Sequence, residues 1–165
     1  MRSRSIVVAA AAVALVASIG PASASVAAKL NACKVLKASE VTRVTGFPAT
    51  KLAKQQQGPP GSGICGYSLD DPSTPTRNVS VLVQKGNSQD LKIGYRTAKA
   101  AFKDQVESVS GFGENAFYAG GGLNTLYVLK GSTLFYVQYV ALADTDAAGI
   151  KDDVVAMAKI AQPRV

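Results

Sequence analysis

Apolar and polar residues alternate along several segments of the chain, and this period of two predicts β-strands that bury one face. The clearest segment is Asn78–Lys85, in which Val79, Val81 and Val83 fall on one side and polar residues with Leu82 on the other. Further strands are expected at Thr50–Lys54, Ile64–Ser68, Ala116–Tyr118, Leu126–Leu129 and Leu134–Leu142.

A period close to that of an α-helix occurs in other segments. The longest is Asp90–Val106, where Leu91, Tyr95, Ala98 and Phe102 share one side. Further helices are expected at Ala38–Thr45, ended by Gly46, and at Ala147–Ala161, with Ile150, Val154, Met157 and Ala161 inward and Pro163 beyond its end.

The apolar segments on either side of Gly131–Ser132 predict a hairpin, because glycine at the first central position is typical of a type II′ turn. This register places Tyr127 opposite Tyr136 and Val128 opposite Phe135. The order of helices and strands predicts an α+β fold, with a single antiparallel sheet and helices packed mainly on one face.

The first 24 residues have the pattern of an export signal. Arg2 and Arg4 precede the apolar stretch Ile6–Ile19, and Pro21–Ala24 supplies small residues before a cleavage site at Ser25. The stretch is shorter than the roughly 20 apolar residues of a membrane-spanning helix. We therefore expect cleavage and a secreted, extracytoplasmic protein that associates with the cell envelope or is free of it.

Removing 24 of the 165 residues would leave 141, a size typical of one domain. Residues 25–32 are expected to form a flexible lead, and residues 33–165 a single domain. The segment Leu30–Cys33 loosely imitates a lipidation site, but Lys29 and Asn31 are unfavourable there, so lipidation of Cys33 is the weaker alternative.

Cys33 and Cys65 are the two cysteines, and both follow the export signal. Thiols pair and persist in an oxidising compartment, whereas redox-active or metal-binding pairs usually have C-x-x-C spacing or further soft ligands. We therefore expect a structural disulfide between Cys33 and Cys65.

The formal net charge is +7, and removal of Arg2 and Arg4 lowers it to +5. This excess is modest and is spread along the chain. It favours solubility and mild attraction to anionic surfaces over nucleic-acid binding, and we expect a monomer without a nucleic-acid partner.

The chain contains no histidine, which excludes Ser-His-Asp and Cys-His catalysis and imidazole-ligated metals. We expect no catalytic residue, no cofactor and no metal site. The acidic pairs Asp70–Asp71 and Asp152–Asp153 fit a turn and a helix start. Gly111–Gly113 and Gly120–Gly122 are interpreted as turns, because neither is followed by the residues of a phosphate-binding loop.

Basic residues follow the helical period beside the apolar side of Asp90–Val106. These residues are Lys92, Arg96, Lys99 and Lys103. They fit either a solvated helix flank or a docking strip for an anionic partner, such as a wall polymer or lipid headgroups.

A second candidate surface is the side of the sheet opposite the valines of Asn78–Lys85. The period of two places Leu82, Gln84, Tyr127, Tyr136 and Gln138 on that side. Tyrosines on an uncovered sheet can bind a ligand or a protein. If a loop or the N-terminal segment covers them, the face is structural.

Three motifs resemble those of a known group: Cys33–Leu36 followed by Glu40–Val41 and Gly46, then Gly63–Tyr67, then Val109–Phe117. Together they resemble the small secreted proteins and lipoproteins of actinobacteria that contain a domain of unknown function. The resemblance covers most of the mature chain and implies an extracytoplasmic α+β domain with one disulfide. It carries over no catalytic residue.

These observations predict a secreted, non-enzymatic binding or interaction domain whose partner is a small ligand or an envelope component. One alternative is an envelope-associated hydrolase that uses carboxylates, which convergent acids in a cleft would favour. Another is a protein-partner module, for example an enzyme inhibitor, that presents the loop Gln55–Gly63. An ordered, protruding loop would favour this second alternative.

Overall fold

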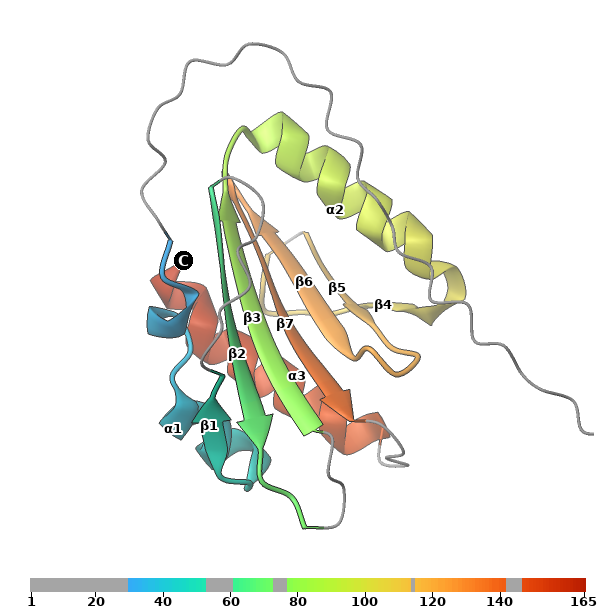
Figure 1. Cartoon of the computed structure of the whole chain (residues 1–165). Coiled ribbons are helices and arrows are strands. Elements are labelled where there is room, and N and C mark those ends of the chain that lie inside the picture. The colour runs from blue at the N-terminus through green and yellow to red at the C-terminus, as the bar shows by residue number, and fades with distance from the viewer. Residues whose placement is uncertain (1–29, 53–60, 73–76, 114, 142–146) are drawn as a thin grey trace, which may run out of the picture.

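The computed structural model describes residues 30–52, 61–72, 77–113, 115–141 and 147–165. Within these ranges, seven strands form one antiparallel sheet in the spatial order β1-β2-β3-β7-β6-β5-β4 (Figure 1). The strands are β1 (Ala49–Lys51), β2 (Ser62–Leu69), β3 (Arg77–Lys85), β4 (Val106–Ser108), β5 (Ala116–Ala119), β6 (Thr125–Lys130) and β7 (Thr133–Ala141). The predicted single antiparallel sheet is confirmed.

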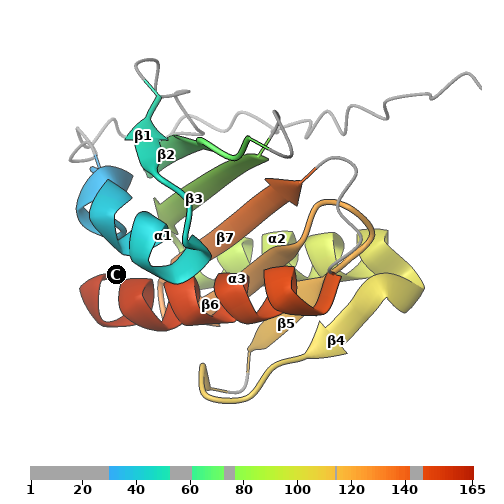
Figure 2. The ribbon, with the colours of Figure 1, turned by 90° about the horizontal axis from the view of Figure 1, so that it is seen from below.

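The α-helices in the described part of the chain are α1 (Ala38–Thr45), α2 (Ser88–Phe102) and α3 (Ala147–Ala161). Short 3₁₀ turns are η1 (Ala32–Lys34), η2 (Lys103–Gln105) and η3 (Gln162–Arg164). Figure 2 shows α1 and α3 together on one face of the sheet and α2 on the other. The α+β class is confirmed, with two of the three helices on the same face. No helix in the described ranges is long and apolar enough to cross a membrane.

The main hydrophobic core lies between the sheet and the pair α1 and α3. The predicted inward residues Val79, Val81, Val128 and Phe135 are fully buried in it. Buried residues of the two helices complete this core, among them Val41, Val154 and Met157. The alternation in the sequence therefore correctly predicted which strand residues face the main core.

A second, smaller core lies under α2, which packs over β5, β6 and β7. Leu91 and Tyr95 of α2 are buried and Phe102 is half-buried, as the helical period predicts. They pack with sheet residues that include Phe117 and Leu129. Helix α2 therefore covers part of the sheet face that carries Tyr127 and Tyr136. From the sequence, a loop or the N-terminal segment was considered as the cover of this face.

The predicted hairpin joins β6 and β7. Lys130 lies opposite Thr133, so Gly131 and Ser132 form the two-residue turn. Gly131 has a φ of 58°, the positive value that the first position of a type II′ turn requires. The predicted pairs Tyr127 with Tyr136 and Val128 with Phe135 are likewise confirmed.

A disulfide joins Cys33 of η1 to Cys65 of β2, as predicted, with the two Cα atoms 5.1 Å apart. The packed domain begins before Cys33, because Ala32 is buried and Leu30 packs against the core. A Cβ atom on Gly63 would lie 2.1 Å from the Leu30 carbonyl oxygen. Glycine at position 63 therefore lets residues 30–32 pack on β2. These residues were predicted to belong to a flexible lead, so that part of the prediction is wrong.

Helix α2 ends earlier than predicted. Lys103 has a φ of 43°, which ends the helix at Phe102. Val106 was expected within the helix but begins β4, where it pairs with Ala119 of β5. The apolar period could not show this, since Val106 also falls on the apolar side of an extended helix. The strand bounds also differ from the predicted ones, most clearly in β1, which is Ala49–Lys51, and in β2, which begins at Ser62; the others differ by one residue at one or both ends.

Candidate functional site

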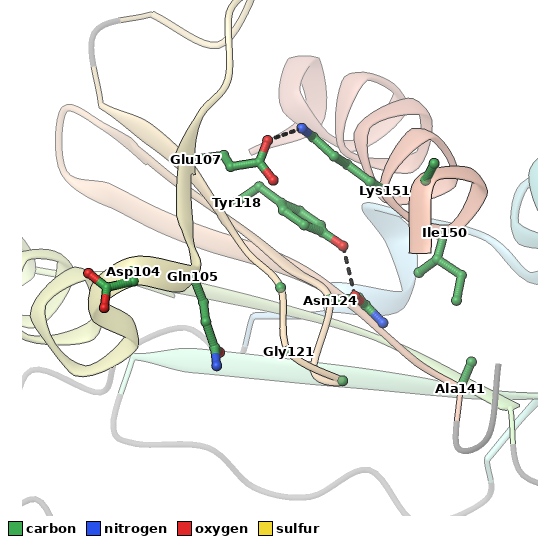
Figure 3. Close-up of a pocket in the computed structure, with 12 residues that line it drawn as sticks. Asp104, Gln105, Glu107, Tyr118, Gly121, Asn124, Ala141, Ile150 and Lys151 are labelled. Atoms are coloured by element: carbon green, nitrogen blue, oxygen red, sulfur yellow. Dashed lines mark hydrogen bonds and ion pairs between the residues drawn. The ribbon is translucent and has the colours of Figure 1, made fainter. Parts of the chain in front are cut away.

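A cavity of about 600 Å³ opens where η2 and β4, the β5–β6 turn and the start of α3 meet (Figure 3). Its lining comes from three separate segments of the chain, within residues 104–107, 118–124 and 141–151. The side chains with polar or charged groups in this lining are Asp104, Gln105, Glu107, Tyr118, Asn124 and Lys151.

A buried hydrogen bond between two side chains forms the wall of the cavity. The Tyr118 hydroxyl donates to Oδ1 of Asn124 at 2.8 Å, and the residues are 3% and 6% exposed. Burial, with a smaller contribution from the charge of Glu107, raises the pKa of Tyr118 to about 12. The Tyr118 hydroxyl therefore stays protonated at neutral pH and donates its hydrogen bond to the amide oxygen of Asn124. The Nδ2 end of Asn124 is left toward the cavity (Figure 3).

The turn that carries Asn124 requires positive φ angles. Gly121, Gly122 and Asn124 have φ values of 72°, 94° and 39°, which glycine and asparagine adopt at lower cost than other residues. A Cβ atom on Gly121 would lie 2.2 Å from the end of the Gln105 side chain, which would have to move aside. The Asn124 carbonyl accepts the N–H of Tyr139 at 3.0 Å, which ties the turn to β7.

The charged groups of the cavity do not form a carboxylate pair. Glu107 forms an ion pair with Lys151, whose ammonium lies 5.6 Å from the centre of the Tyr118 ring. Asp104 points away from Glu107 (Figure 3). Catalysis by two carboxylates requires that both face one substrate bond, so these two acids give the hydrolase alternative no support.

The other features named from sequence lie elsewhere. Asp71 forms an ion pair with Arg77 at 2.8 Å, and Asp152 is exposed on α3. Residues 55–60 of the predicted loop Gln55–Gly63 lie outside the described residues, as does the expected export signal.

The predicted basic stripe lies on the solvent side of α2. Lys92, Arg96 and Lys99 are exposed on the helix, and Lys103 is exposed as the first residue of η2. Within the described part of the chain, none of the four side chains forms a hydrogen bond or an ion pair. Their charges are therefore available to a partner.

The predicted tyrosine face is closed at its centre. Tyr127 and Tyr136 are neighbours with ring centres 5.4 Å apart, as their register requires. Tyr127 also stacks on Phe117 at 4.8 Å and packs against Phe102 of α2 at 6.0 Å. Burial, with a smaller effect of Tyr136, raises the pKa of Tyr127 to about 12. The two rings therefore belong to an aromatic cluster that extends under α2.

The remaining residues of this face are also largely engaged. Leu82 is buried, and Tyr136, Gln84 and Gln138 are half-buried. The Gln138 amide nitrogen donates to Oγ1 of Thr125 at 3.2 Å. The open surface left to a ligand is therefore smaller than the alternation predicts.

The cavity residues were not singled out from the sequence. Gly120–Gly122 was interpreted as a turn, and the structure has a turn there. One partial signal was available: Asn124 follows the glycines, and asparagine is the residue other than glycine that best tolerates positive φ. That signal indicates a turn, not a binding site.

Among the described residues, no group of three or more His, Cys, Asp or Glu side chains could hold a metal ion. Comparison with known proteins finds no match for this chain among family models, curated proteins or solved structures.

Proposed function

We propose that this protein is an exported, non-enzymatic domain that docks on an anionic lipid surface through the outer side of α2. The observation that carries the proposal is the set of exposed, unpaired cations in the described structure: Lys92, Arg96, Lys99 and Lys103. An exported location is supported by the disulfide, since disulfides persist in oxidising compartments.

The way α2 is held makes it suited to docking. Leu91 and Tyr95 anchor it to the sheet, and no other described helix lies on that face (Figure 2). With 3.6 residues per turn, the Cα positions of Lys92, Arg96 and Lys99 lie within about 60° around the helix axis. Their charges can therefore approach one surface together. Each basic residue near an anionic membrane contributes about 1 kcal/mol, so four give weak, reversible attachment in the millimolar range.

Ile93 favours a lipid surface over a soluble polymer. Its side chain is 59% exposed. Ile93 is two positions from both Leu91 and Tyr95, so it lies about 200° from each around the helix and points away from the sheet. A bilayer offers an apolar layer below its headgroups, into which an exposed apolar side chain beside cations can insert.

Co-sedimentation with vesicles tests the proposal. The mature protein should bind vesicles that contain phosphatidylglycerol, release them as salt rises, and not bind vesicles of phosphatidylcholine alone. Replacement of all four stripe residues by Gln should abolish this binding. The matched control replaces Lys34, Lys51, Lys130 and Lys159 by Gln, which removes the same charge from exposed positions elsewhere and should preserve most of the binding.

Ile93→Ser separates lipid from polymer as the partner. It should weaken binding to the vesicles and leave any binding to polyphosphate, a soluble anionic polymer, unchanged. Equal losses in the stripe variant and its control would show that net charge acts instead of the stripe. Wild-type protein that binds polyphosphate but not the vesicles would overturn the lipid assignment.

A further inference from the structure

We infer that the cavity beside Asn124 binds a neutral polyhydroxylated molecule, such as a monosaccharide or a disaccharide unit. The inference concerns different side chains from the docking stripe and does not depend on it. It rests on the polar atoms around the cavity that have no partner, on the charge of the lining, and on its size.

The first observation is a donor at the cavity wall that has no acceptor among the described residues. Asn124 is only 6% exposed, and its oxygen is held by Tyr118. Within the described part of the chain, its Nδ2 group makes no hydrogen bond, and it faces the cavity (Figure 3). The group is therefore open to a molecule in the cavity, and an oxygen atom of that molecule can accept its N–H.

The second observation is that acceptors lie around the same cavity. Lys151 occupies Oε2 of Glu107, and Oε1 has no hydrogen bond to any described residue. The Gln105 side chain, which is likewise unbonded in the described ranges, carries both an N–H donor and an acceptor oxygen. A hydroxyl group both donates and accepts, so neighbouring hydroxyls of one molecule match this mixture of groups.

The charge of the lining argues against an anionic ligand. Asp104 and Glu107 are negative and Lys151 is the basic residue of the described lining, so the cavity carries a net negative charge. Carboxylates and phosphates would be repelled. A cation would have to compete with Lys151 for Glu107, whereas a hydroxyl can donate to Oε1 and leave the ion pair intact.

The size and the apolar part of the lining agree with this assignment. About 600 Å³ lies within the range of roughly 300 to 1,000 Å³ typical of small-molecule sites. Ala141, Ala148 and Ile150 form an apolar wall that the C–H groups of a sugar ring can contact.

Titrations followed by ¹H–¹⁵N NMR spectra test the inference. The compounds are glucose, N-acetylglucosamine, cellobiose and chitobiose, with citrate and choline as anionic and cationic comparisons. At least one saccharide should cause saturable shifts of the amide signals of Gly121, Gly122, Ala148 and Ile150. Citrate should cause none at these positions.

Two variants and a control connect the shifts to the cavity. Asn124→Asp keeps an acceptor for Tyr118 and tolerates the positive φ, but replaces the N–H donor with an oxygen, so it should weaken binding at least about tenfold. Ala148→Leu should weaken binding by filling the cavity from its exposed rim. Ala101→Leu adds the same side chain at an exposed position of α2 and should bind as the wild type does.

The results separate this inference from the proposed docking. The four-fold stripe variant should keep the saccharide shifts, and Ala148→Leu should keep vesicle binding. Absence of saturable cavity shifts with all four saccharides up to their solubility limits would overturn the inference, as would unchanged binding in both cavity variants. Shifts caused by choline alone would assign the cavity to a cation instead.

Discussion

Arg164 of η3 holds Glu40 of α1 through two parallel hydrogen bonds of 2.7 Å, across 124 positions of the chain. The same guanidinium donates to the Val35 carbonyl at 3.1 Å. Glu40 also accepts the N–H of Lys37 at 2.9 Å, which caps the start of the helix. One carboxylate therefore connects the first helix to the last turn of the structure.

This pair predicts a pH dependence of folding. Hydrogen bonding to Arg164, opposed by burial and assisted by the Lys37 N–H, lowers the pKa of Glu40 from 4.5 to about 2. A carboxyl whose folded pKa is lowered stabilises the fold above its unfolded pKa and loses this contribution as pH falls through the folded value. Glu40→Gln should therefore show a shallower decrease of unfolding free energy between pH 4.5 and 2 than the wild type, measured by urea unfolding.

The control for this experiment is Glu107→Gln, which removes the more exposed ion pair with Lys151. It should follow the wild-type pH curve more closely than Glu40→Gln does. Parallel curves for wild type and Glu40→Gln would show that the Arg164 contact does not contribute.

The disulfide predicts a stability difference and a mass. Replacing Cys33 and Cys65 by Ser should lower the unfolding free energy by about 3 to 4 kcal/mol, because the unfolded chain gains the freedom of the opened loop. If the expected export signal is cleaved, the intact mass should correspond to residues 25–165, and it should increase by the mass of two hydrogens on reduction. Free thiols, or a lipid mass on Cys33, would contradict this prediction.

Adjacent residues of β7 should differ in their effect on stability. Phe135 is fully buried against α1 and α3, so Phe135→Ala should cost roughly 3 to 5 kcal/mol. Tyr136 is half-buried on the other face, and Tyr136→Ala should cost less. Urea unfolding of the two variants compares them directly. Equal losses would mean that both faces of β7 are packed to the same degree.

The hydrogen bond in the cavity wall predicts a smaller loss. Tyr118→Phe removes the donor to Asn124 and leaves its buried oxygen unpaired, so we expect a loss of about 1 to 3 kcal/mol in unfolding free energy. Tyr95→Phe is the control, since the Tyr95 hydroxyl has no hydrogen bond to a described residue. A loss no larger than that of the control would show that the Tyr118 bond adds nothing to stability.

Features that depend on neighbouring residues were determined by the sequence. Glycine at position 131 favours a two-residue type II′ turn, and the turn fixes the register that pairs Tyr127 with Tyr136. The apolar period of α2 identified Leu91 and Tyr95 as its inward side. Two cysteines allow a single pairing within the chain, and the structure contains it. In each case, the deciding interaction is local or has a single partner.

The tertiary structure decided which face α2 covers. β6 and β7 carry apolar residues on both sides, such as Val128 next to Leu129 and Phe135 next to Leu134. A strand with two apolar faces must bury both of them, but the pattern does not show which helix packs on which face. The same limit applied to Val106, whose apolar side chain fits a helix or a strand and which only the contact with Ala119 placed in β4.

The cavity and the Glu40–Arg164 pair were also decided by tertiary structure alone. Asn124, Glu107 and Lys151 carry common polar groups at positions with no periodic spacing. They meet because the β5–β6 turn, β4 and α3 are brought together by burial of the two cores, an energy summed over many apolar contacts. The amino-acid pattern specifies which side chains leave water, whereas the place where polar groups converge follows from how those buried surfaces fit together.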